Sequence, residues 1–77
     1  AVIALPGKPG QILRVGGRYF VAIRDGMVVS AAAGATGTLE LGARVAVAAD
    51  AWGLAASPDG RRLVVTSAWT HTVTVLD

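Results

Sequence analysis

The sequence predicts an all-β fold made of short antiparallel strands. Runs rich in Val and Thr, such as residues 62–67 and 71–77, are bounded by Gly, Pro, Asp and Ser, the pattern of strands joined by turns. No stretch carries a helical apolar stripe except residues 27–35, where three alanines favour helix. Because glycines flank those alanines, we expect an extended loop or an irregular strand there.

The expected strands follow one another with short connections. In order they are residues 2–5, 11–15, 18–24, 38–41, 44–48, 53–57, 62–67 and 71–77. Gly16-Gly17 suits a primed two-residue turn, because Gly tolerates positive φ. Residues 57–60 (SPDG) suit a type I turn, with Pro presetting φ and Asp accepting backbone hydrogen bonds. We expect a third tight turn at Gly42-Ala43.

The chain also repeats itself with a shift of 43 residues. The matched pairs are Val2 and Val45, Gly10 and Gly53, Gly17 and Gly60, Arg18 and Arg61, and Val21 and Val64. The matching glycines bracket matching strand-like runs, and a four-stranded propeller blade repeats roughly every 40–45 residues. The repeat therefore predicts four-stranded antiparallel meander blades of a β-propeller.

The blades expected in this chain do not complete a ring. Residues 1–5 are the outer strand of a preceding blade, residues 10–48 form one complete blade, and residues 53–77 give three strands of the next. A ring needs about four to eight blades, and the chain has 77 residues. We therefore expect an incomplete ring, with the remaining blades of the same propeller or other copies of the chain as partners. We interpret the chain as a segment of a longer propeller.

One stretch resembles a known repeat. Residues 52–67 (WGLAASPDGRRLVVTS), followed by residues 71–77 (HTVTVLD), resemble the YVTN-type β-propeller repeat. The resemblance is specific over residues 44–77 and weaker over residues 1–43. Two residues depart from the repeat, which usually has Asn at the place of His71 and Tyr at the place of Val64. The resemblance implies a periplasmic or extracellular location.

In a meander, alternate connections lie at the same end of the blades. Residues 6–9, 25–37, 49–52 and 68–70 share one end, whereas the tight turns share the other. Long loops bearing tryptophan are a common location for binding residues. A protein partner or a small-molecule ligand is therefore expected at the end with the long loops.

Four residues at this end are candidates for a ligand site. Trp52 and Trp69 can form a platform for a sugar, a quinone or a protein, although such residues more often fill the space between blades. His71 is either a metal or haem ligand or, as we favour, a hydrogen-bonded residue at a strand start. Asp50 can bind a cation together with Asp25, but a single loop carboxylate usually accepts backbone hydrogen bonds. No residue is assigned a catalytic role.

Composition excludes several other classes. The net charge is only +2, and the arginines occur at both ends of the expected blades, so we expect no nucleic-acid partner. The longest uncharged stretches, residues 26–39 and 63–76, are shorter than the roughly 18–20 residues of a spanning helix, so no membrane span is expected. The chain has no Cys, and hence neither a disulfide nor the covalent haem attachment motif. We expect no cofactor in this segment; a haem or a divalent cation would belong to the parent protein.

Three functions agree with the resemblance. In the first, which we favour, the chain is part of a binding or structural scaffold in a secreted or periplasmic protein. In the second, it belongs to the docking propeller of a c-type haem or quinone-linked redox protein. In the third, it belongs to a lactonase-like hydrolase propeller. Fold analogy alone does not choose among them.

Overall fold

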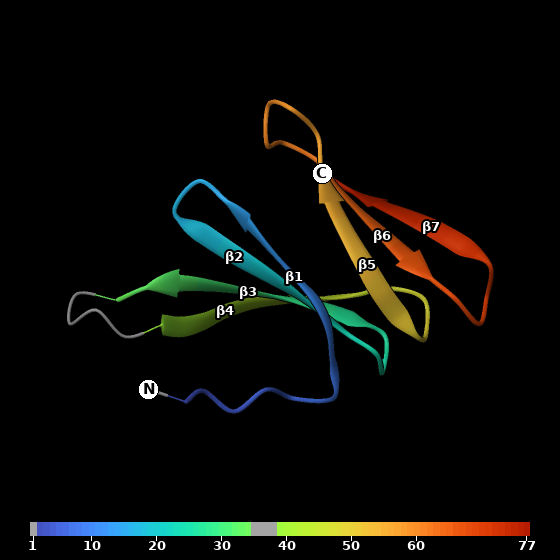
Figure 1. Cartoon of the computed structure of the whole chain (residues 1–77), viewed down its shortest axis with the longest axis horizontal. Coiled ribbons are helices and arrows are strands. Elements are labelled where there is room, and N and C mark those ends of the chain that lie inside the picture. The colour runs from blue at the N-terminus through green and yellow to red at the C-terminus, as the bar shows by residue number, and fades with distance from the viewer. Residues whose placement is uncertain (1, 35–38) are drawn as a thin grey trace.

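The computed structural model describes residues 2–34 and 39–77 and contains two antiparallel sheets, with no helix in those residues (Figure 1). The first sheet has the strand order β1 (Pro9–Val15), β2 (Arg18–Ile23), β3 (Met27–Ala33) and β4 (Leu39–Ala46). The second sheet has the order β5 (Ala51–Ala56), β6 (Leu63–Ser67) and β7 (Thr72–Leu76). Within each sheet every strand pairs antiparallel with its neighbour in sequence, so the predicted all-β fold of antiparallel meanders is confirmed.

The strand β3 lies where the sequence predicted a loop or an irregular strand. It pairs along its length with β2, and its Val28 and Val29 are both buried, one on each face of the sheet. Of the two alternatives predicted for residues 27–35, the strand is therefore found over Met27–Ala33, with a register irregularity against β4, and the loop is not. Residues 35–37 of the expected loop lie outside the described part of the chain.

The strand β4 replaces two predicted strands. Residues 38–41 and 44–48 were expected to pair with each other across a turn at Gly42-Ala43, but residues 39–46 form one strand that pairs with β3; Thr38 lies outside the described residues. The pairing passes from Val29 opposite Arg44 to Ala31 opposite Leu41, so Gly42-Ala43 is a β-bulge. A Cβ at Gly42 would lie 2.8 Å from Ser30 Oγ. The glycine therefore marks a bulge and not a turn.

The two ends of the expected blades differ slightly from the prediction. Residues 2–5 form no strand in the structure, although Leu5 packs against the first sheet. Their assignment to a preceding blade stays a prediction. The strand β5 begins at Ala51, whereas the preceding loop was expected to extend through Trp52.

Backbone hydrogen bonds show how the two sheets correspond. Arg24 N donates to Lys8 O at 2.8 Å in the first sheet, and Ala68 N donates to Asp50 O at 3.2 Å in the second. Lys8 therefore corresponds to Asp50, a shift one residue smaller than the predicted 43. Arg24 corresponds to Ala68, a shift one residue larger than the predicted 43. The difference arises in the turns, since Gly16-Gly17 joins β1 to β2 and a longer turn joins β5 to β6.

The core is divided into two small clusters. One lies between the sheets and contains Ala22, Val28, Ala51 and Val65. The other lies on the far face of the first sheet and contains Val21, Ile23 and Val29, with Leu5 packed against them. Most of these side chains are small, which allows the sheets to approach closely.

The two sheets meet most closely along β1 and β5, which lie side by side in Figure 1. Leu54 N donates a hydrogen bond of 3.1 Å to Gln11 Oε1 across this contact. A Cβ at Gly10 would lie 2.9 Å from Trp52 O. Glycine is thus required for the backbones to come this close.

Candidate binding surface

Four connections gather at one end of the two sheets, which we call the loop end: residues 6–8, 24–26, 47–50 and 68–71. Backbone hydrogen bonds join them in series. Val47 N donates to Gly26 O at 3.0 Å and Asp50 N donates to Arg24 O at 2.7 Å. The bonds from Arg24 to Lys8 and from Ala68 to Asp50 complete the series. The loop end is therefore a continuous surface, in agreement with the prediction that these alternate connections share one end. The prediction that the long connections lie there was wrong, because residues 24–26 replace the expected loop at 25–37 and the longer connection of residues 57–62 lies at the opposite end.

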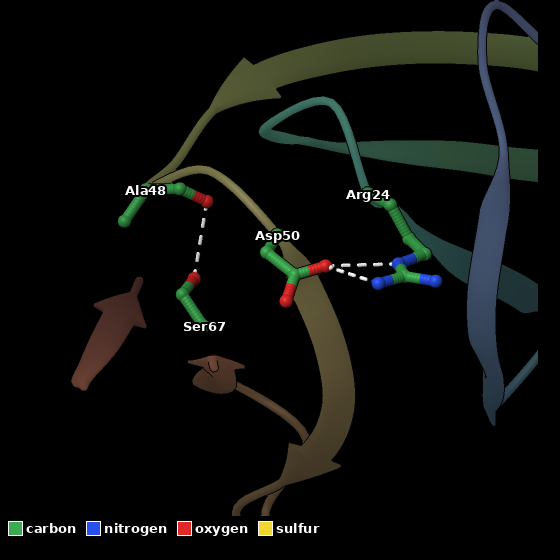
Figure 2. A network of polar contacts seen from close by, with 4 residues as sticks. All are labelled: Arg24, Ala48, Asp50 and Ser67. Carbon is green, nitrogen blue, oxygen red and sulfur yellow. Dashed lines mark hydrogen bonds and ion pairs between the residues drawn. The ribbon is translucent and has the colours of Figure 1, made fainter. Parts of the chain in front are cut away.

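An ion pair crosses this surface between the sheets (Figure 2). Arg24 Nε and Nη2 both donate to Asp50 Oδ1, at 2.9 and 2.7 Å. The Asp50 side chain is only 12% exposed, while that of Arg24 is 44% exposed. Arg24 Cζ also lies 5.2 Å from the centre of the Trp52 ring, within the range of a cation–π contact. The arginine is thus held by a carboxylate and an aromatic ring at once.

Asp50 is placed for this contact by an unusual backbone conformation. Its φ is 57°, in the left-handed region that Asp tolerates better than most residues. Its backbone N–H and C=O bind the loops on either side of it. Asp50 therefore joins the sheets through both its backbone and its side chain. The carboxylate was expected to accept backbone hydrogen bonds, but it accepts from the Arg24 guanidinium, and it is the backbone N–H and C=O of Asp50 that bond to the neighbouring loops.

Trp69 lines a shallow hollow beside the ion pair. The hollow has a volume of about 350 Å³, and its lining residues are Lys8, Arg24, Asp25, Ala49, Asp50 and Trp69. Trp69 is 82% exposed, so it does not fill a gap between the two sheets. The hollow combines charges of both signs with one aromatic ring, which suits a polar ligand that also presents an apolar face.

The other candidates occupy different positions. Trp52 lies in β5 and is 48% exposed, with its ring under Arg24 and not in the hollow. His71 ends the turn before β7 with φ 52°, and it does not line the hollow. Residues 2–34 and 39–77 contain no group of three or more His, Cys, Asp or Glu side chains placed to hold a metal ion. Of the four predicted residues, the structure places Asp50 and Trp69 in one hollow. Trp52 is connected to this hollow only by its contact with Arg24, which lines it.

A buried hydroxyl stabilises the base of the loop end. Ser67 is 2% exposed, and its Oγ donates a 3.0 Å hydrogen bond to Ala48 O (Figure 2). This bond satisfies the hydroxyl and attaches the end of β6 to the connection that precedes β5. The loop residues above it are therefore anchored to a strand of the second sheet.

The opposite end carries a second hollow, of about 750 Å³, around the β5–β6 turn. Ser57 Oγ donates to Asp59 Oδ1 at 2.6 Å and accepts from Arg62 N at 3.1 Å. The hydrogen bond from Ser57, followed by one from the backbone N–H of Arg61, lowers the pKa of Asp59 below its ordinary value of 3.8. These bonds confirm the predicted structural role of the SPDG turn, so this hollow is a consequence of turn geometry.

Two residues of the loop end were missed by the sequence analysis. Arg24 was grouped with the other arginines as a solvated charge, and Lys8 received no role. The available signal for Arg24 was its place at the end of a strand, next to the loop carboxylate Asp25, at the end where the binding loops were expected. The actual partner, Asp50, lies too far along the chain for spacing to reveal it.

Comparison with known proteins gives no further information. No protein-family model matches the chain, and neither a curated protein nor a solved structure shows significant similarity to it. In the part of the chain that the structure describes, no helix is long and apolar enough to cross a membrane.

Proposed function

We propose that the chain is a two-blade segment of a YVTN-like β-propeller and acts as a binding or structural scaffold of a secreted or periplasmic protein. One observation carries the proposal: two corresponding antiparallel sheets bring the segments that bear Lys8, Asp25 and Trp69 together at a single end. The sheets hold the loops, and the loops supply the exposed groups. In such a scaffold the ligand is recognised at the loop end.

The residues of the loop end fall into a structural pair and a group that can contact a ligand, which supports a binding role. Arg24 and Asp50 neutralise each other and tie the two sheets together, so they serve the architecture. Lys8, Asp25 and Trp69 line the same hollow, and they are the groups left to contact a partner. A protein surface that offers opposite charges and an apolar side chain fits this set.

The proposal can be tested by changing the loop end alone. Replacing Lys8, Asp25 and Trp69 together with Ser should leave the unfolding temperature within a few degrees, because none of the three lies in either core cluster. Replacing Val65 with Ala should instead lower it clearly. A scaffold whose fold collapses after the triple substitution would contradict the proposal.

The tryptophans also allow the two other functions to be tested by fluorescence. Both lie near the loop end, so Ca²⁺ or a soluble quinone bound there should alter their emission. Saturable quenching by the quinone that is lost in Trp69→Ala would favour a redox propeller. Saturable binding of Ca²⁺ that is lost in Asp50→Asn would favour a lactonase-like propeller. For a scaffold we expect neither probe to give a saturable response at millimolar concentration.

A further inference from the structure

The contact between the two sheets joins unlike faces of corresponding strands. The first sheet contributes Ala22 and Val28, and the second contributes Val65. By the correspondence of the backbone hydrogen bonds, Val65 matches Val21, which lies on the opposite face of the first sheet, away from Ala22. When two sheets pack through unlike faces, each sheet keeps one face uncovered. The same kind of contact can then be repeated head to tail with a further sheet.

We call the uncovered face of the second sheet the β5–β7 open face. By the strand correspondence it is equivalent to the face of the first sheet that contains Ala22 and packs against the second sheet. Its side chains are all uncharged and are those of Ala55, Val64, Thr66, Val73 and Val75. Val73 is 62% exposed and Val75 is 58% exposed. Two valines left this exposed on one strand face form an apolar patch of the kind found at interaction sites.

The unused face of the first sheet is the β1–β4 open face. It resembles the face of the second sheet that packs against the first sheet. Ile12 is paired with Val21 and is 62% exposed. Leu5 packs against the buried cluster that contains Val21, and its counterpart Val47 packs against the cluster between the sheets. Ile12 and Leu5 therefore repeat apolar features of an interface that already exists within the chain, and the exposed side chains of Arg14 and Arg44 lie on the same face.

The backbone repeats the same features. In the existing contact, the N–H groups of Val47 and Asp50 donate to the turn that follows β2. Their counterparts are Leu5 and Lys8, and within the described residues neither N–H donates to a backbone carbonyl. Two donors are thus placed where the turn of another sheet would accept their hydrogen bonds.

The accessible surface is also larger than that of a closed globule. A compact monomer of 7.8 kDa exposes about 4,400 Å² by the scaling of folded proteins, whereas this chain exposes 5069 Å². The excess, on the order of 700 Å², is close to the roughly 800 Å² that each partner buries in a standard interface.

We propose that the chain associates head to tail with a second copy of itself, the β5–β7 open face of one copy packing on the β1–β4 open face of the next. The proposal rests on the observed packing of the two sheets. In it a second copy takes the place that further blades would have in the proposed function, and it does not depend on what the loop end binds.

Two substitutions, each blocking one face, test this directly. In sedimentation experiments the unaltered chain should grow in mass with concentration, while Val75→Lys and Ile12→Lys should each weaken association at least tenfold. A mixture of the two variants should form a one-to-one dimer, because one intact face of each kind remains. Only a contact between unlike faces gives this rescue.

The controls separate folding and ligand binding from association. Thr72→Lys adds the same charge to the other face of β7 and should leave association unchanged, as should Trp69→Ser at the loop end. Circular dichroism confirms that each variant keeps its strands, and Val73→Lys replaces Val75→Lys if the latter does not fold. An unaltered chain that stays monomeric at millimolar concentration would overturn the proposal, as would folded variants whose mixture stays monomeric.

Discussion

Arg24 and Asp50 join the two sheets through a forked contact in which both Nε and Nη2 of the arginine donate to a single carboxylate oxygen. Water screens this contact less than it screens a fully exposed pair, because the Asp50 side chain is 12% exposed and Arg24 is also held over Trp52. It closes the loop end at the place where the chain passes from one sheet to the next.

Substitutions at Asp50 should separate its charge from its backbone conformation. Asp50→Asn removes the charge but tolerates φ of 57°, and it should lower the free energy of unfolding by about 0.5–1 kcal/mol. Asp50→Ala should lower it by about 1–2 kcal/mol more, since Ala is strained in the left-handed region. Urea unfolding measures both. Equal losses for Asn and Ala would show that the backbone conformation contributes nothing.

Gly10 should be intolerant of any side chain. A Cβ there would lie 2.9 Å from Trp52 O and 3.0 Å from Trp52 Cα, and backbone atoms cannot move aside cheaply. We expect Gly10→Ala to lower the free energy of unfolding by about 1–3 kcal/mol. Gly17→Ala is the matched control, because a Cβ at Gly17 has no neighbour within 4 Å. A Gly10 variant as stable as the control would mean that β1 and β5 are not in close contact.

The fold class could be predicted from the sequence because strand content depends on local patterns. Residues 62–67, a β-branched run next to a turn motif, coincide closely with β6. The pairing of the first sheet could not be predicted in the same way. The glycine at position 42 fits a turn or a bulge equally well, and only the partner strand, with Ser30 opposite it, decides between them.

The candidate site was only partly predictable for a similar reason. Counting alternate connections placed Asp50 and Trp69 at the same end of the sheets, which needs no knowledge of distances. The pairing of Asp50 with Arg24 depends on how two separate sheets pack, and the spacing of residues contains no such information. The sequence repeat was found with a single shift of 43 residues and no gaps. The turn between β1 and β2 is shorter than the turn between β5 and β6, so the true shift is one residue less than 43 for the strands before these turns and one residue more for the strands after them.

His71 should behave as a backbone residue and not as a ligand. Its φ of 52° is unfavourable for most side chains, so His71→Gly should raise the free energy of unfolding by about 0.5–1 kcal/mol or leave it unchanged. His71→Val should lower it, since β-branched residues are poorly tolerated there.

The measurement for His71 is thermal unfolding of the three proteins side by side. The order of stability should be Gly at or above His, and His above Val. If Gly were instead the least stable, the imidazole itself would be making an essential contact, and its interpretation as a turn residue would be wrong.

The β5–β6 turn should give stability a dependence on acidic pH. In the folded chain the hydroxyl of Ser57 and the backbone N–H of Arg61 hold the pKa of Asp59 below its ordinary value of 3.8. A carboxyl group whose pKa is lowered by folding stabilises the fold when it is ionised, that is above pH 3.8, and this contribution is lost as the pH falls through the lowered pKa.

Asp59→Asn should remove that dependence. The variant should be less stable than the unaltered chain at pH 7, and the difference between the two should shrink as the pH falls below 3.8. Because Asp59 lies at the surface, the effect should be small and should be followed by urea midpoints at several pH values. Ser57→Ala, which removes the main donor, should weaken the dependence in the same direction. A difference between the proteins that grows toward low pH would contradict the role of this carboxylate in the turn.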